Sequence, residues 1–201
     1  MDYTDIINLK QAMNSNEITV QDVALYGYIT KASRLLDRLC TSQPNVVNYF
    51  MTEDVTDEIL TNGVIDYAGR LSFWPHKPII NSVTSLSYRF SPRSPWTEAD
   101  LTLLSLEQET VVYEGSLWPS ERPYVKVSYN GGLGTTLAEF PLDFVDVATV
   151  MAVRLFKEER AGLSDTIGVA ELGRLEYTKA FPQRVMDTLN IGGYIRTAPW
   201  T

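Results

Sequence analysis

Histidine and cysteine each occur once in this chain, as His76 and Cys40, and this limits the chemistry that the sequence can support. A Ser-His-Asp or Cys-His mechanism would have to use His76. Because His76 lies between Pro75 and Lys77, before a predicted strand and with no nucleophile motif nearby, we interpret it as a surface turn residue. A single cysteine excludes an intrachain disulfide and a cysteine-rich zinc site, and Cys40 is typical of a small core residue.

Carboxylates gather at two places along the chain. The four between residues 53 and 58 match no calcium-loop spacing, so a solvated acidic patch beside a strand is favoured over a metal site. Asp143 and Asp146 are spaced as a paired acid and base would be. Both fall in the first turns of a predicted helix, however, where carboxylates suit the helix dipole.

Glycines and aromatic residues give two further signals. The segment 130–134, Asn-Gly-Gly-Leu-Gly, follows a predicted strand, but no Lys-Ser/Thr comes after it and no helix begins at once. A connection that needs positive φ is therefore a better interpretation than a phosphate-binding loop. The four Trp and eleven Tyr residues could line a sugar-binding face, although core or interface packing is their more frequent use. We predict no catalytic residue, no metal ligand and no cofactor, and hence no enzyme.

Composition is that of a globular protein that does not read nucleic acid. The 201 residues are 44% hydrophobic and 21% charged, enough for one buried core or a core with a small module. No apolar run approaches the roughly 20 residues that span a bilayer, and the acidic start lacks the features of a signal peptide. We expect no membrane partner and synthesis in a cytoplasm. The net charge of −8 argues against gripping DNA but allows a surface that DNA passes.

The elements that must position these residues follow from the apolar spacing. A helix is predicted to end near Thr41, with one apolar face made of Leu25, Ile29, Ala32, Leu36 and Leu39. A β-rich region is predicted over about 49–129, with strands at 79–90, 109–114 and 124–129. Within this region, the proline-containing segment 91–122 is predicted to be a protruding loop that carries Trp96 and Trp118 and meets a partner.

The helix predicted over 141–160 is apolar on most of its circumference. One apolar stripe suits the core of the monomer, and a second stripe needs another cover in a chain of this size. We predict that a neighbouring subunit covers this second stripe, which consists of Phe144, Val147, Val150 and Met151.

The end of the chain is predicted to be an arm that docks on a partner. A short helix over 182–189 leads to Gly192 and Gly193, which give a flexible joint after the body of residues 1–191. Residues 192–201 are too apolar for a solvated tail and too few to fold alone. The predicted docking residues are Tyr194, Ile195, Arg196, Pro199 and Trp200.

Several stretches resemble the head–tail adaptor proteins of tailed bacteriophages, also called head completion or connector proteins. They are a helix with an Ala-Ser pair, a strand that a proline precedes, a Val-x-Val-x-Tyr-x-x-Gly strand and turn, a helix start of Pro-x-Asp type and a short last element. In this sequence they are residues 29–40, 74–86, 124–132, 141–144 and 182–185. Together they span roughly residues 25 to 190. The extra N-terminal residues and the large 91–122 segment depart from the family's pattern.

The resemblance implies an α+β fold, a small helical bundle with an inserted β-rich region and an extended C-terminal arm. It implies a virion protein that forms a ring with copies of itself, commonly twelve-fold, beneath the portal. Such a ring extends the DNA channel, contacts the portal protein and receives the stopper or tail-completion protein. Residues 192–201 would then dock on the portal. The alternatives are a glycan-active hydrolase with paired carboxylates and a carbohydrate-binding module that uses Trp and Tyr.

Overall fold

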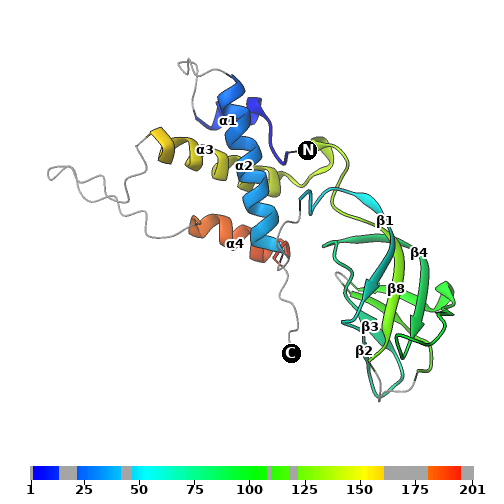
Figure 1. The fold of residues 1–201 in the computed structure, drawn as a ribbon. Helices are drawn as coiled ribbons and strands as arrows, with labels where there is room; N and C mark the ends of the chain where they lie inside the picture. Colours follow the sequence, from blue (N-terminus) through cyan, green and yellow to red (C-terminus); the bar gives the residue numbers. More distant parts are fainter. Residues whose placement is uncertain are drawn as a thin grey trace. The chain divides into compact units, whose positions relative to one another are not determined.

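The computed structural model describes residues 2–13, 22–41, 47–107, 110–117, 122–160 and 181–195. The chain divides into two compact units (Figure 1). The helical unit comprises Met1–Asn48 and Thr136–Thr201, and the β unit comprises Tyr49–Thr135. The β unit is therefore an insertion between the second and third helices. This organisation confirms the predicted α+β class, a helical bundle interrupted by a β-rich region.

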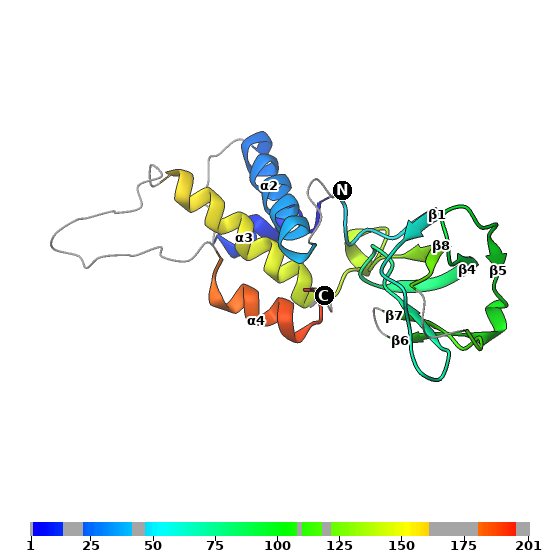
Figure 2. The same cartoon turned by 60° about the horizontal axis from the view of Figure 1, so that its bottom comes forward.

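The described helices of the helical unit pack through apolar faces, and the buried face of α2 is the one that its sequence predicts. They are α1 (Ile6–Ala12), α2 (Asp22–Cys40), α3 (Leu142–Arg160) and α4 (Gln183–Ile191), with a 3-10 turn, η2 (Leu137–Glu139), before α3. In Figures 1 and 2, α2 crosses α3. The buried side chains of these two helices include Leu25, Ile29, Ala32 and Leu36 on α2, and Phe144, Val147, Ala148, Met151, Ala152 and Phe156 on α3.

Two four-stranded antiparallel sheets form the β unit. The first has the strand order β1-β8-β4-β5, with β1 (Glu53–Leu60), β4 (Ile80–Arg89), β5 (Thr97–Glu98) and β8 (Tyr124–Gly131). The second has the order β2-β3-β7-β6, with β2 (Val64–Ile65), β3 (Leu71–Phe73), β6 (Leu104–Glu107) and β7 (Thr110–Tyr113). A 3-10 turn, η1 (Leu101–Leu103), precedes β6. A single core contains side chains of both sheets, among them Leu71, Phe73, Leu86, Val111, Val125, Val127 and Tyr129.

Strand β8 shows how the sequence builds this core. Its residues alternate between buried and partly exposed along its whole length. Since side chains of a strand point to opposite faces in turn, Val125 and Val127 enter the core while Tyr124 and Lys126 lie on the outward face. The same alternation in the sequence predicts a strand here, and the structure confirms it, since β8 pairs with β1 on one side and with β4 on the other.

Segment 91–122 is largely folded rather than a protruding loop. Its described residues include β5, η1, β6 and β7, and Figure 2 shows β5, β6 and β7 on the β unit. Val111, Val112 and Tyr113 of β7 are buried, with exposed fractions of at most 7%. The prolines in the sequence favour a loop, whereas the short apolar run after them provides the interior of the second sheet.

A glycine with positive φ allows the turn after β8. Gly132 has a φ of 130°, which L side chains rarely adopt, and this confirms the predicted need for glycine here. A Cβ atom at this position would lie 2.4 Å from the carbonyl oxygen of Met51. Two chain segments therefore approach each other at Gly132 as only glycine permits.

Two glycine-to-alanine substitutions should change stability in opposite directions. Gly132→Ala should destabilise the β unit by about 2 kcal/mol or more, because both the backbone conformation and the close contact resist a side chain. Gly27→Ala lies in the middle of α2, where an added Cβ meets nothing within 4 Å. It should stabilise the helical unit by up to about 1 kcal/mol. Urea unfolding followed by circular dichroism measures the free energy of unfolding of each variant. If the two substitutions change this free energy equally, this account of Gly132 is wrong.

Candidate functional site

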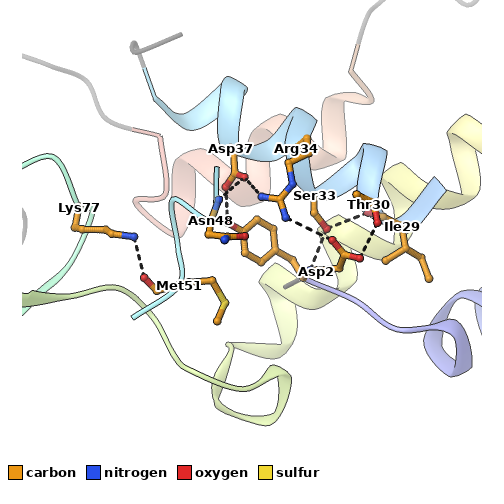
Figure 3. Close-up of polar contacts among 10 residues, drawn as sticks. Asp2, Ile29, Thr30, Ser33, Arg34, Asp37, Asn48, Met51 and Lys77 are labelled. Carbon is orange, nitrogen blue, oxygen red and sulfur yellow. Dashed lines mark hydrogen bonds and ion pairs between the residues drawn. The ribbon is translucent and has the colours of Figure 1, made fainter. Parts of the chain in front are cut away.

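In the described part of the helical unit, the buried carboxylate of Asp37 is the centre of a polar cluster (Figure 3). It accepts hydrogen bonds from the Tyr3 hydroxyl, from Nη1 of Arg34 at 2.6 Å and from the backbone N–H of Asn48 at 3.0 Å. Tyr3 and Asn48 are 34 and 11 residues away from Asp37 along the chain. Asp37 thus joins the N-terminal segment, α2 and the last residue before the β unit.

The N-terminal segment makes further hydrogen bonds to α2 and α3. The Tyr3 N–H donates to Oγ of Ser33 at 3.0 Å, and Asp2 accepts from the Thr30 hydroxyl at 2.8 Å. The hydroxyls of Thr4 and Thr149 share a hydrogen bond of 2.7 Å. Because buried polar groups must be paired, these contacts hold the segment in one position on the helices. The cluster is therefore a structural fastening of the N-terminal segment.

His76 pairs with Glu58 in the β unit, and this pair is the closest that the described residues come to an acid–base arrangement. Nδ1 of His76 contacts Oε1 of Glu58. The Glu58 side chain is 11% exposed and that of His76 is 50% exposed. Burial raises the pKa of the Glu58 carboxyl, but hydrogen bonds from His76 and Tyr129 and the charge of His76 outweigh it, so the pKa lies below its usual range.

Tyr129 and Lys77, beside this pair, make further hydrogen bonds and an ion pair in the β unit. The Tyr129 hydroxyl accepts a hydrogen bond from the Lys77 N–H at 3.2 Å. The Lys77 ammonium donates to the Met51 carbonyl at 3.0 Å, a contact drawn in Figure 3, and pairs with Glu53 at 2.8 Å. The arrangement ties β1 and β8 to the segment before β4. His76 is a half-exposed turn residue as predicted, whereas Glu58 is far more buried than the predicted solvated patch.

The other candidate groups have structural positions. Burial, with the nearby charge of Asp37, raises the pKa of the Cys40 thiol to about 12, which keeps it protonated and suits the predicted core role. Asp143 lies in the first turn of α3, where it accepts from the Phe144 N–H at 2.9 Å. Across the described residues, no group of three or more His, Cys, Asp or Glu side chains is placed to hold a metal ion.

The predicted subunit interface on α3 lies largely inside the helical unit. Phe144, Val147 and Met151 have exposed fractions of 0%, 4% and 2%, and Val150 is partly buried. The ring centroid of Phe144 lies 5.3 Å from that of Tyr3 and 5.0 Å from that of Tyr194. For Phe144, the two terminal segments supply the cover that the apolar pattern assigns to another subunit. A ring of copies stays a prediction, but these three buried side chains do not offer a surface for it.

The first aromatic residue of the predicted arm rests on its own helical unit. Tyr194 is 7% exposed, and its hydroxyl donates to Asp143 Oδ1 at 3.2 Å. Burial, with the charge of Asp143 and this hydrogen bond, raises the Tyr194 pKa to about 12, so the hydroxyl stays protonated. Ile195 is partly buried. The remaining predicted docking residues, Arg196, Pro199 and Trp200, lie outside the described residues.

The structure describes one of the two tryptophans of the predicted partner-binding segment. Trp96 is partly buried beside the first sheet, with the guanidinium carbon of Arg89 4.2 Å from its ring centroid. Trp118 lies outside the described residues. The position of Trp96 next to a cation is not visible in the sequence, where the two residues are separated by a proline-containing turn.

Both units expose large apolar side chains. On the helical unit Leu142 is 82% and Ile191 88% exposed, and Val23 and Tyr26 of α2 are also exposed. The β unit exposes Ile59, Val64, Tyr67, Leu101, Leu103 and Leu106. Of the helices in the described ranges, none is both long and apolar enough to cross a membrane.

Comparisons with known proteins give a weak structural likeness. No family model matches the chain, and no curated protein matches it. A chain from a structure described as "Neck of empty GTA particle computed with C6 symmetry" aligns at a TM-score of 0.46 and 12% identity, covering 75% of this chain and 76% of that chain. A chain from "Virion of native gene transfer agent (GTA) particle" aligns at 0.46 and 13%, covering 92% and 84%. At these scores the likeness carries no argument about fold or role.

The Glu58–His76 pair predicts a pH dependence of stability. The usual pKa of the carboxyl is 4.5, and the folded-state pKa is lower. The ionised carboxylate therefore stabilises the folded β unit at pH values above the usual pKa, and this stabilisation is lost as the pH falls through the folded-state pKa. Glu58→Gln should flatten the fall in thermal stability on acidification, whereas Glu98→Gln, at an exposed position on β5, should leave it unchanged. Identical pH profiles for Glu58→Gln and the wild type would contradict the assignment.

Proposed function

We propose that this protein is a structural component of a tailed-phage-like particle, and more specifically an adaptor that forms a ring beneath the portal. The ring would extend the DNA channel and offer a surface to the stopper or tail. Its partners would be further copies of the chain, the portal protein and a tail-side protein, with DNA passing through the channel. The protein would be located in the virion and assembled in the host cytoplasm.

The observation that carries this proposal is that the resembling stretches fall on elements of the fold. The stretch 29–40 lies on α2, and the stretch 74–86 contains the first part of β4 and the residues before it. The stretch 124–132 is β8 with its glycine turn, and 141–144 starts α3. The stretch 182–185 starts α4, with Pro182 as its N-cap. Each of the five resembling stretches thus lies on or beside a described element, and this regular placement supports the proposal.

Exposed apolar side chains support a role in an assembly. Leu142 and Ile191 lie at the start of α3 and the end of α4, and more than four-fifths of each is exposed. In the β unit, Leu101, Leu103 and Leu106 follow one another closely along η1 and β6. Single exposed apolar residues are ordinary, whereas closely spaced ones favour contact with another protein surface. Portal, tail and neighbouring copies would supply such surfaces.

Charge is consistent with a channel that DNA crosses. The net charge of −8 makes lasting contact with a polyanion unfavourable. A channel wall benefits from this property, because DNA must pass along it without binding. The glycan-active alternatives need carboxylates beside Trp, but Trp96 lies next to the cations Arg89 and Lys126.

Electron microscopy of the purified chain, alone and mixed with the portal protein of its particle, tests the proposal. We expect closed rings, at least on the portal, with one symmetry across particles. Mass photometry of the same mixtures gives the number of copies. A chain that remains monomeric and does not join the portal at micromolar concentrations would overturn the proposed function.

Two truncations should separate a docking arm from the folded body. Ending the chain after Ile195 keeps Tyr194 and its hydrogen bond to Asp143, so the thermal midpoint should stay the same while the affinity for the portal falls at least about tenfold. Ending it after Ile191 also removes the buried Tyr194 ring and should lower the midpoint by several degrees. Differential scanning calorimetry and portal pull-down measure the two effects. Full portal affinity without residues 196–201 would show that docking uses the folded body.

A further inference from the structure

An arginine lies between aromatic rings at one corner of the outward face of the first sheet. Arg89 on β4 is the register partner of Tyr124 on β8, so the two side chains share a face. The guanidinium carbon of Arg89 lies 4.2 Å from the Trp96 ring centroid and 5.6 Å from that of Tyr124. The Lys126 ammonium lies 5.4 Å from the same Trp96 ring. We call these four residues the basic corner.

Arg89 has no acceptor for its hydrogen bonds within the described residues. Its Nε atom is buried and unpartnered there, and no ion pair of Arg89 occurs among them, although Glu98 lies on the adjacent strand β5. Lys126, by contrast, is 3.7 Å from Asp57. A guanidinium presents five planar donors suited to a bidentate carboxylate, and leaving the buried Nε–H unmet is unfavourable.

An exposed carboxylate lies at the diagonally opposite corner of the same face. Asp54 on β1 is the register partner of Asn130 on β8 and accepts a hydrogen bond from its amide at 2.7 Å. Asn130 is six positions along β8 from Tyr124, the partner of Arg89. At about 3.4 Å per residue the two corners are about 20 Å apart along the strand, too far for an ion pair within one chain.

We propose that the basic corner of one copy binds the Asp54 corner of the next copy, as a head-to-tail contact within the ring; this rests on the proposed function. The two surfaces differ and are opposite in charge, so they can form a heterologous contact, which gives a ring where the rotation between copies closes. Arginine flanked by Trp and Tyr is also the composition most enriched at the energetic centres of protein interfaces.

A protein carboxylate suits the basic corner better than a nucleic-acid phosphate. Gripping DNA requires several cations that neutralise several phosphates, and Lys126 is already close to Asp57. The chain carries eight more negative than positive charges, so each further copy brings carboxylates to this corner and weakens its attraction for a polyanion. Aromatic rings that sandwich one guanidinium favour a single planar acceptor such as the Asp54 carboxylate.

Charge exchange between the two corners tests this contact. Arg89→Glu and Asp54→Arg should each raise the concentration needed for half-maximal assembly about tenfold or more. Their mixture should restore rings in alternating order, because the glutamate introduced in one variant then meets the arginine introduced in the other while the remaining contact is unchanged. The double variant in one chain should also assemble. Sedimentation velocity and electron microscopy, with and without portal, give the readout, and circular dichroism confirms that each variant is folded.

Matched controls define the outcomes that would overturn the proposal. Arg93→Glu makes the same charge change at an exposed turn position four residues away and should leave assembly unchanged. Arg89→Gln and Asp54→Asn remove charge with little change of shape and should weaken assembly in the same direction. If Arg89→Glu forms rings as readily as the wild type, or if the mixture of Arg89→Glu and Asp54→Arg forms none, the contact is overturned but the proposed function is not. The contact is also overturned if the wild type binds DNA and Arg89→Glu abolishes this binding while assembly stays unchanged. Wild-type chains that never associate would overturn the proposed function as well.

Discussion

The helical unit depends on one buried carboxylate. A charged group that is removed from water is tolerated only when donors surround it, and Asp37 obtains them from Tyr3, Arg34 and Asn48. This requirement draws the N-terminal segment onto α2. Once Tyr3 is held there, its ring lies against Phe140 and Phe144, which completes one side of the core. A single polar requirement thus determines where an otherwise short and weakly patterned segment lies, and with it which face of α3 is closed.

Local patterns predict the elements well, and contacts between distant residues explain most of what they miss. The apolar spacing on α2, the alternation in β8 and the positive φ at Gly132 follow from near neighbours in the sequence. The cover on Phe144 comes instead from Tyr3 and Tyr194, near the two ends of the chain, and neither contact leaves a periodic signal. The apolar excess of α3 therefore predicts a subunit interface, whereas Tyr3 and Tyr194 of the same chain pack on its Phe144. The pairing of His76 with Glu58 cannot be predicted from the sequence for the same reason, because it depends on how β1 lies beside the segment before β4.

The segment 91–122 shows a different limit of sequence reasoning. Prolines and turn residues at its start are typical of loops, and they do form turns here. The three buried residues of β7 are too few to give a clear strand period, yet they complete the second sheet by pairing with β3 and β6. Short strands of this kind gain stability from pairing and burial rather than from propensity. The candidate surface around Trp96 exists only because the sheet returns β5 to the side of β4, which brings Trp96 over Arg89.

Charged side chains of the two units fall into two groups: those that are paired within their own unit and those that remain available to a partner. Buried or half-buried charges such as Asp37 and Glu58 have partners within their own unit. Arg89 and Asp54 have the opposite character, because each lies on the outward face of one sheet and has no oppositely charged partner within 4 Å in the described part of the chain. A repeated contact of modest strength becomes strong when many copies close on themselves, since each new copy is held at two sides. For an acidic chain this arrangement has a further consequence: every Arg89–Asp54 contact neutralises one charge of each sign, so the acid excess remains on the surfaces outside the contact. In the proposed ring, Arg89 would hold neighbouring copies together while the acid excess of the chain stays available to keep DNA from binding.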